Sequence, residues 1–396
     1  MNGRIYVSGI GVTSAIGDNV EQNLESLKSQ SSGIGKIQIL NSKHKDEYEA
    51  GEINYTNEEL SEQIGISAKL KIPRTALLAI KAAKEACESA GLEGAEKQNT
   101  GLIGGTTVGG MDKTEKHYIN PENDYSFIKS HSCGYITELI AENLNIKGYI
   151  STLNTACSSS TNSILTGARL IKHGIADRII AGGFDSLSKF TLNGFKTLLI
   201  LSPEKCKPFD RNRQGLNLGE GAGFVVLESE ESLLKRGKQP ICELTGYSNA
   251  NDAYHQTASS PNGEGPYISM TKAMKLANFQ PGDIDYINAH GTGTDNNDLS
   301  EGMAFKRIFD GGIPYFSSTK PYIGHTLGAA GGIEAVYSVL AIKENLIFPN
   351  LFFKNPIEEL GFSPVKKLID DITIKNVMSN SFGFGGNDST LIFSKI

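Results

Sequence analysis

The chain has 396 residues, enough for a sizeable buried core and for two domains or one large double domain. Apolar residues make up 39% and charged residues 21%, which is a globular composition. The net charge of −6 argues against a general nucleic-acid binder, because such proteins are normally basic. The five cysteines form no CxxC pair and their number is odd, which disfavours disulfides and a zinc ribbon and favours a reduced, cytoplasmic protein.

The first predicted element is a strand near the N-terminus. Residues 4–10 are apolar, but Ser8 and Gly9 interrupt them and no cleavage site follows, so a signal peptide is disfavoured. We expect a buried strand that leads into a glycine turn. No run of 18 apolar residues occurs, and we therefore expect no membrane span.

Strands and helices alternate along the rest of the chain. Apolar spacing predicts helices over residues 74–90, 158–173, 267–277 and 328–344. Buried strands are predicted over residues 100–105, 149–153, 178–182, 222–228, 241–247, 284–289, 377–381 and 390–393. The charged stretch 229–240 is expected to cross between two halves, residues 1–240 and 241–396. This alternation predicts an α/β architecture with covered sheets.

Cys157 lies where a predicted strand turns into a helix rich in small residues. A thiol at a helix start is close to the helix dipole and to free backbone N–H groups, and both favour the nucleophilic thiolate. The same N–H groups could hold a developing oxyanion. The alternative is a buried structural cysteine, which is the common fate of a lone cysteine.

Two histidines follow predicted strands in glycine-rich turns. His290 lies in NAHGTGT, and His325 lies in STKPYIGH together with Lys320. Loops after strands are where α/β proteins place their chemistry, and two imidazoles can polarise a carbonyl and move protons. Neither histidine has a second His or Cys at metal-ligand spacing, so a zinc site is disfavoured. Two satisfied polar turn residues remain the alternative.

A third glycine-rich segment, SFGFGGND, covers residues 381–388 and is followed by a strand. Its three glycines permit positive φ and close approach of the backbone. It lacks the GxGxxG and GxxxxGK[ST] patterns of nucleotide-binding loops. Phe384 between glycines suggests a movable plug, and the alternative is a tight hairpin turn with one core Phe.

Together and in this order, these motifs resemble the β-ketoacyl-acyl-carrier-protein synthases, the elongating type II ketosynthases of the thiolase-like superfamily. The matching segments are SGIGVTSAIG, NTACSSS, KPFDRNRQGLNLGEGAG, NAHGTGT, STKPYIGHTLGAAGGIE and NSFGFGG. The resemblance spans essentially the whole chain. It implies two pseudo-symmetric ketosynthase halves packed as five layers, α-β-α-β-α, in a homodimer. The nucleophile would lie in the first half, and the two histidines and the gating loop in the second.

The resemblance assigns a role to each candidate residue. Cys157 would take an acyl group from the phosphopantetheine arm of acyl carrier protein as a thioester. His290 and His325 would bind the malonyl thioester carbonyl and assist decarboxylation, and the resulting carbanion would attack the acyl-Cys in a Claisen condensation. Lys320 would order the histidines, and Glu301 would belong to the same network. No redox cofactor is implied.

Further residues match the family's binding positions. The backbone N–H groups of Cys157 and Phe384 would form the oxyanion hole. The gate and acyl pocket would be formed by Phe382, Phe384 and Val108. The pantetheine arm would bind Thr257, Thr292 and Thr294. A monovalent cation, Na⁺ or K⁺, would have a structural role at Asn288, Glu334, Ser379 and Asn380.

The acyl carrier protein is acidic, so its docking face on this chain need only be locally basic. The candidate contacts are Lys69, Lys71, Arg74, Lys205, Lys207, Arg211 and Arg213. A solvated charged surface is the alternative for each of them.

Two departures from the family pattern stand out. The usual Gly-Gly-Thr-Asn after the gating Phe is here Gly-Gly-Asn-Asp, residues 385–388. Val108 stands where many relatives carry a bulkier residue, which predicts a deeper acyl pocket.

The rival functions are a non-catalytic chain-length partner subunit, a biosynthetic thiolase and a priming synthase. The partner subunit is disfavoured because Cys157 and both histidines are present. The thiolase is disfavoured because no cysteine follows Cys242, and the two-His pattern disfavours the priming synthase. The acyl primer, the product length, the choice between fatty acid and polyene or polyketide synthesis, and the choice between homodimer and heterodimer stay open.

Overall fold

The computed structural model describes residues 3–119, 125, 127–310 and 312–396. Its main sheet joins ten strands in the order β10-β9-β11-β12-β8-β1-β7-β6-β4-β5. The sheet divides where β1 (Ile5–Ser14) meets β8 (Cys242–Asn251), because only Tyr6 and Val7 pair there. A separate ribbon pairs β2 (Gly35–Lys36) with β3 (Glu49–Ala50).

The two halves of the main sheet repeat one topology. The first half contains β1, β4 (Gly101–Gly105), β5 (Ile150–Leu153), β6 (Arg178–Asp185) and β7 (Gly221–Ser229). The second contains β8, β9 (Tyr286–Asn288), β10 (Tyr315–Ser317), β11 (Asn376–Gly383) and β12 (Asn387–Ser394). Numbered along the chain within each half, the strands lie in the order 1-5-4-2-3 in both. Strands 1, 5 and 4 pair antiparallel and strands 4, 2 and 3 pair parallel in each half, so the halves are pseudo-symmetric.

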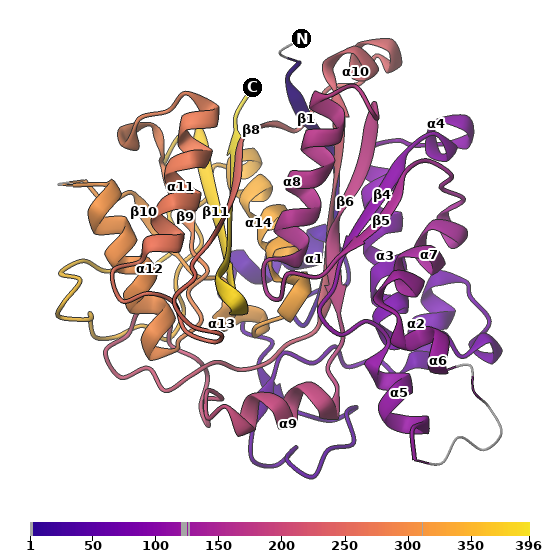
Figure 1. The fold of residues 1–396 in the computed structure, drawn as a ribbon, viewed down its shortest axis with the longest axis horizontal. Helices are drawn as coiled ribbons and strands as arrows, with labels where there is room; N and C mark the ends of the chain where they lie inside the picture. The colour runs from indigo at the N-terminus through magenta and orange to yellow at the C-terminus, as the bar shows by residue number, and fades with distance from the viewer. Residues whose placement is uncertain (1–2, 120–124, 126, 311) are drawn as a thin grey trace.

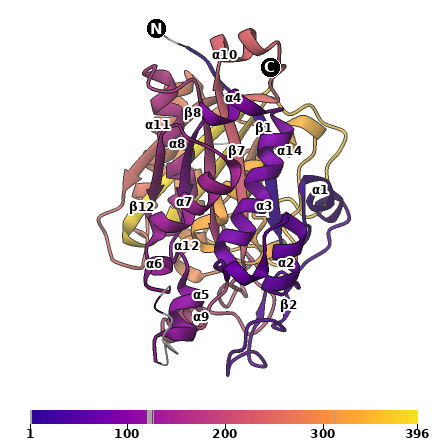
Figure 2. The same cartoon turned by 90° about the vertical axis from the view of Figure 1, so that its right-hand side faces the viewer.

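Helices form three layers around the two half-sheets (Figure 1). Between the half-sheets, α8 (Ser159–Lys172) packs against α14 (Ala330–Glu344). The outer face of the first half-sheet is covered by α3 (Arg74–Ser89), on which α7 (Cys133–Leu144) packs, as Figure 2 shows from the side. The outer face of the second is covered by α11 (Glu264–Ala277) and α12 (Asp295–Ile308). This arrangement confirms the predicted α-β-α-β-α fold.

The composition of the central helices explains their position. Every α14 residue from Ala330 to Ile342 is buried, as expected for a helix enclosed by sheet on both sides. Small residues fill the first turns of α8, which lets the two central helices approach closely. The remaining α-helices are short: α1 (Val20–Lys28), α2 (Asn57–Ile64), α4 (Gly94–Gln98), α5 (Met111–His117), α6 (Phe127–His131), α9 (Lys189–Thr197), α10 (Glu230–Arg236) and α13 (Lys320–Ile323).

The prediction of a glycine turn after residue 10 is wrong. The strand β1 continues to Ser14 through Gly9 and Gly11, where α3 crosses it closely. A β-carbon on Gly11 would lie 2.1 Å from the carbonyl oxygen of Ala82. The glycines therefore permit helix–strand contact and do not form a turn. The charged crossover forms α10, and the expected division at residue 240 lies just before β8.

The helices in the described ranges include none that is both long and apolar enough to cross a lipid bilayer.

Candidate active site

Cys157 lies between the end of β5 and the first turn of α8. The preceding residue, Ala156, has a φ of +53°, a conformation that L-residues adopt rarely and that marks a constrained turn. The thiol is 6% exposed. The turn therefore fixes the Sγ atom at the N-terminal end of a buried helix.

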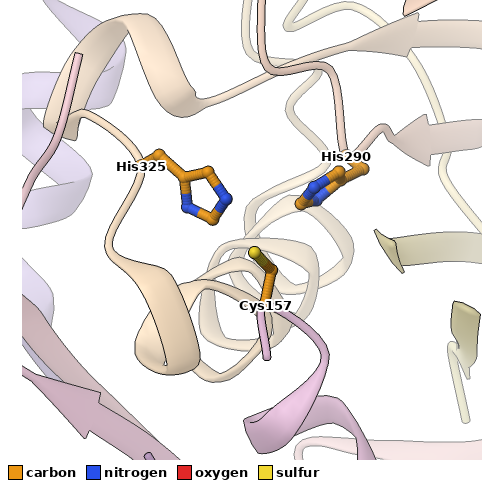
Figure 3. A group of neighbouring side chains, drawn as sticks. All are labelled: Cys157, His290 and His325. Atoms are coloured by element: carbon orange, nitrogen blue, oxygen red, sulfur yellow. The ribbon is translucent and has the colours of Figure 1, made fainter. Parts of the chain in front are cut away.

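His290 and His325 reach the same point from the second half of the chain. His290 follows β9 and His325 follows α13, and the two rings lie nearly perpendicular at 84° with their centroids 5.4 Å apart. Figure 3 shows both rings pointing toward the sulfur of Cys157. The sulfur and the nearest ring nitrogens all lie within 4.8 Å of one another. The fold thus assembles the predicted cysteine and both predicted histidines into one site.

Hydrogen bonds at Nδ1 fix the tautomer of each histidine. The Nζ of Lys320 lies 3.2 Å from Nδ1 of His290, and the backbone N–H of Leu327 donates to Nδ1 of His325 at 3.1 Å. Each Nδ1 is therefore an acceptor, and the ring proton lies on Nε2 in both residues. The site contains two N–H donors rather than one donor and one base.

Both imidazoles are held in the neutral form. Burial lowers the pKa of His290 well below its usual value, and the nearby Lys320 and His325 lower it further. Burial and then Lys320 lower the pKa of His325 in the same way. At neutral pH the two rings polarise a carbonyl by hydrogen bonding without carrying a positive charge.

The expectation that the helix start favours a Cys157 thiolate is wrong for the substrate-free site. Burial raises the pKa of the thiol to about 11. Lys320 and the backbone N–H groups of Phe384 and Cys157 lower it, but they do not offset the loss of hydration. The resting nucleophile is therefore a thiol. The same two N–H groups lie close to the Sγ atom.

A buried ion pair supports the histidines. Lys320 Nζ lies 2.6 Å from Oε1 of Glu334, and these side chains are 2% and 1% exposed. Glu301 accepts the backbone N–H groups of His290 and Gly291, both at 2.9 Å, and burial raises its pKa to about 7. Glu301 thus holds the backbone of the turn that carries His290.

A cavity of about 290 Å³ reaches the side chains of Cys157, His290 and His325. Its wall includes the three residues predicted to bind pantetheine: Thr257, Thr292 and Thr294. Thr292 and Thr294 share a hydrogen bond of 2.8 Å, and Thr257 is exposed near the mouth. All three threonines thus line the same cavity as Cys157.

Phe195, Leu198 and Phe384 line both this cavity and a second one. The second cavity, of about 440 Å³, is almost wholly apolar and includes Val108, Phe190 and Leu198 in its wall. Phe384 lines both cavities, and its ring stacks on Phe195 at 6.0 Å. Phe382 instead packs against the ring of His290 at 5.8 Å. Phe384 therefore lies in a wall shared by the cavity at the thiol and this apolar chamber.

Two of the predicted carrier-protein contacts are wrong. The Arg213 side chain is 7% exposed and donates to the backbone carbonyl groups of Asp210, Thr294 and Asp295. Arg74 is 6% exposed and its guanidinium binds the buried carboxylate of Glu220 at 2.6 Å, so it holds α3 to β7 rather than facing a partner. Lys69 and Lys71 are exposed beside it. Lys207 pairs with Glu204 and Arg211 pairs with Glu358 at the surface.

The predicted cation ligands lie close together. Asn288 on β9 is opposite Ser379 on β11, and the buried Oδ1 of Asn288 has no hydrogen-bond partner among the described residues. That free oxygen fits a cation ligand, but the Glu334 carboxylate is already bound by Lys320. The cation site stays a prediction.

The sequence did not identify Phe195 or Asp185. Phe195 lies on α9, and no sequence pattern shows that its ring stacks on Phe384. Asp185 is fully buried and accepts the backbone N–H groups of Thr107, Val108 and Gly328. It thereby joins the apolar chamber wall to the loop after His325. Asp185 could have been noticed in the sequence because it is an acidic residue that closely follows the predicted buried strand 178–182.

Known families match nearly the whole chain. The family described as "Beta-ketoacyl synthase, N-terminal domain" matches residues 2–232, and "Beta-ketoacyl synthase, C-terminal domain" matches residues 241–354. The 3-oxoacyl-[acyl-carrier-protein] synthase 2 of Staphylococcus aureus is 34% identical over all of this chain and 99% of its own length. The protein of the same name from Coxiella burnetii is 34% identical over 99% of both chains.

Solved structures agree with these relatives. The ishigamide ketosynthase/chain length factor superposes with a TM-score of 0.93 at 30% identity over the whole of both chains. The Xenorhabdus doucetiae ketosynthase ApeO, solved with its chain length factor ApeC, superposes with a TM-score of 0.84 at 30% identity over 100% of this chain and 98% of that one.

Proposed function

Because the chain belongs to the β-ketoacyl synthase family of condensing acyltransferases, we propose that it joins an acyl group to malonyl-acyl carrier protein by decarboxylative Claisen condensation. The product is 3-oxoacyl-acyl carrier protein. The observation that carries this proposal is the convergence of Cys157, His290 and His325 within 4.8 Å.

The first half-reaction is a thioester exchange at Cys157. The Sγ atom attacks the carbonyl of the carrier-bound acyl group, the bond to the pantetheine sulfur breaks, and the thiol proton passes to that sulfur. The N–H groups of Cys157 and Phe384 stabilise the oxyanion of the tetrahedral intermediate. Their proximity to Sγ supports this role.

The second half-reaction uses the two histidines. The Nε2–H groups of His290 and His325 donate to the thioester oxygen of the malonyl group, which stabilises the enolate formed as the carboxylate leaves as CO₂. The enolate carbon attacks the acyl-Cys carbonyl, the bond to the Cys157 sulfur breaks, and the sulfur takes up a proton from solvent. The neutral Nε2–H tautomers support donation at this step.

The two cavities suit the two parts of the substrate. The polar cavity takes the pantetheine arm, with Thr257, Thr292 and Thr294 as hydrogen-bonding partners. The apolar chamber behind Phe384 takes the acyl chain, with Val108 in its wall. Phe384 is the gate between them and Phe382 flanks the histidine. A monovalent cation at Asn288, Glu334, Ser379 and Asn380 would be structural.

The acyl carrier protein docks near Lys69 and Lys71. These residues border a cavity of about 350 Å³ that Lys113, Lys116 and His117 also line. A concentration of positive charge on a chain of net charge −6 suits an acidic partner.

We place the partner subunit along β5, the edge strand of the sheet. Tyr149 and Ile150 are 47% and 40% exposed, and Ile128 of α6 is 60% exposed, which leaves an apolar face for a second subunit. The partner is a second copy or a homologous chain-length subunit. The likeness to two ketosynthase/chain length factor structures favours a specialised polyene-type synthase in a heterodimer as the second candidate function.

The presence of Cys157 disfavours a non-catalytic partner subunit for this chain itself. A free thiol nucleophile needs a reducing compartment, and all five cysteines are unpaired, so we place the protein in the cytoplasm.

Incubation with acyl carrier protein that bears a panel of acyl groups, followed by malonyl-acyl carrier protein, tests the function. Intact mass should show an acyl adduct that Cys157→Ala abolishes, and a 3-oxoacyl product should follow. An adduct that survives Cys157→Ala would overturn the site assignment. If product forms only after a homologous partner is added, the active form is the heterodimer.

A further inference from the structure

Asp388 is a buried acid beside the gate. It is the second residue of β12 and is 1% exposed. Its Oδ2 atom has no hydrogen-bond partner among the described residues. A buried carboxylate oxygen without a partner is costly, so this side chain requires a proton or a neighbouring positive charge.

The charged groups that face Asp388 are both acidic. They are Asp252, from the loop after β8, and Glu301, from α12. The packed face of α11 presents Gly265, where a β-carbon would lie 1.9 Å from Asp388 Oδ2 and 2.5 Å from Asp252 Cβ. The opposing residue on β11 is Phe382, which does not titrate. No ion pair joins Asp388 to a cationic side chain in the described ranges.

Asp252 is the better acceptor of the two aspartates. Its Oδ2 accepts the backbone N–H of Ser260 at 2.9 Å and the Ser260 hydroxyl at 2.7 Å, as a carboxylate does. Burial and the charges of Asp252 and Glu301 raise the pKa of Asp388 well above its usual value. Asp388 is therefore the protonated member of the pair.

The same two segments hold the gate turn. The N–H of Asp252 donates to the carbonyl of Gly386 at 2.8 Å, and the N–H of Gly385 donates to the carbonyl of Gln256 at 2.8 Å. Both glycines have positive φ, +78° and +74°, and a β-carbon on Gly386 would lie 2.0 Å from the carbonyl oxygen of Asp252. The turn directly after Phe384 is thus clamped to the backbone that carries Asp252.

We propose that Asp388 keeps a proton beside the Asp252 carboxylate, and that this proton holds the Gly385–Gly386 turn, and with it Phe384, in the closed position. Loss of the proton to solvent leaves two buried negative charges against Gly265. Their repulsion pushes the Asp252 loop away from β12 and loosens the clamp on the turn. Asp388 is therefore a positioning residue for the gate, and the gate opens more readily as pH rises.

Asp388→Asn tests this inference because the amide is neutral at every pH. Between the pKa of Asp388 in the unfolded chain and its raised pKa in the fold, only the folded wild type retains the proton. The unfolding equilibrium constant of the wild type should therefore rise relative to the variant, by up to about tenfold per pH unit, and then level off.

Alkylation of Cys157 by iodoacetamide reports on the gate, with the rate followed by peptide mass. Dividing the wild-type rate by the Asp388→Asn rate removes the effect of the Cys157 thiolate fraction, which is common to both proteins. This ratio should stay near one until the pH at which the stability difference levels off, and should then rise at least threefold. Asp370→Asn, an exposed aspartate, should give a ratio of one throughout.

A stability difference that does not change with pH would overturn the retained proton on Asp388. A pH-dependent stability difference with a constant alkylation ratio would overturn the link to the gate. The inference rests on the proposed gate role of Phe384, but neither readout needs a substrate. Its failure would therefore be distinguishable from failure of the condensation assay.

Discussion

Lys320 Nζ lies 3.2 Å from Nδ1 of His290, and this contact determines what the histidine can do. An ammonium group only donates hydrogen bonds, so Nδ1 of His290 accepts and Nε2 carries the ring proton. The same Nζ binds Glu334 at 2.6 Å. One lysine thus connects the tautomer of the histidine to a buried carboxylate that neutralises the lysine.

Lys320→Met should reduce both stability and condensation, for separable reasons. It leaves Glu334 as an unpaired buried charge, which costs about 3–5 kcal/mol of unfolding free energy. It also removes the donor to Nδ1 that keeps the ring proton of His290 on Nε2, which should lower the condensation rate by at least about 100-fold. Urea unfolding and product formation measure the two effects.

The double variant Lys320→Met/Glu334→Gln is the control for that prediction. It removes both charges, so most of the stability should return while the condensation rate stays low. Recovery of the rate together with the stability would mean that Lys320 only supports the fold.

The sequence predicted the elements whose apolar periodicity is strong. The helices α3, α8 and α14 end within two residues of their expected limits. The helix α12 was not predicted, because the buried face of its first half is polar. Asp298 and Glu301 accept backbone N–H groups of the turn that carries His290, and Ser300 donates to the carbonyl of Ser260.

Long-range contacts could not be predicted from the sequence for a related reason. Arg74 has the charge of a surface contact, and only its distant partner Glu220, across the first half-sheet, makes it a buried residue. The helix-start rule for Cys157 is correct locally, but burial by the second half of the chain outweighs it. His290 and His325 were found because each lies in a glycine-rich turn, and Cys157 was found because it lies where a predicted strand turns into a helix.

The neutral histidines make a prediction for NMR. Because the pKa values of His290 and His325 lie well below 6.5, ¹⁵N shifts of histidine-labelled protein should show both rings uncharged with unprotonated Nδ1 from pH 8 down to pH 5.5. The single variants His290→Asn and His325→Asn assign the signals. A titration of either active-site ring near pH 6.5 would contradict the prediction.

The raised pKa of Cys157 predicts slow but pH-sensitive alkylation. With a pKa of about 11, the thiolate fraction rises about tenfold per pH unit through pH 7–10, and the rate should follow it. The rate is followed at the Cys157 peptide, and Cys157→Ala defines the background from the other four cysteines. A rate that levels off below pH 8 would show that the helix start outweighs burial after all.

Charge reversal at the proposed docking face should act on binding. Lys69→Glu should raise the KM for carrier-bound substrate about tenfold with kcat nearly unchanged, and rising salt should raise the wild-type KM. The matched control is Lys367→Glu, which should leave KM unchanged. Lys367 is exposed and lines a surface cavity beside β10. Equal effects of both variants, or a KM that is indifferent to salt, would argue against docking at Lys69.

Val108 should set the length of the acyl chain, because it lines the apolar chamber behind Phe384. Val108→Phe fills part of that chamber, so products should become shorter, with transfer slowed about 10–200-fold for each methylene that no longer fits. Val108→Ala enlarges the chamber and should shift products to longer chains. Mass spectrometry of carrier-bound products measures the distribution. Opposite shifts in the two variants are the expected result. An unchanged distribution in both would place the acyl chain elsewhere, since a chain in this chamber cannot avoid its wall.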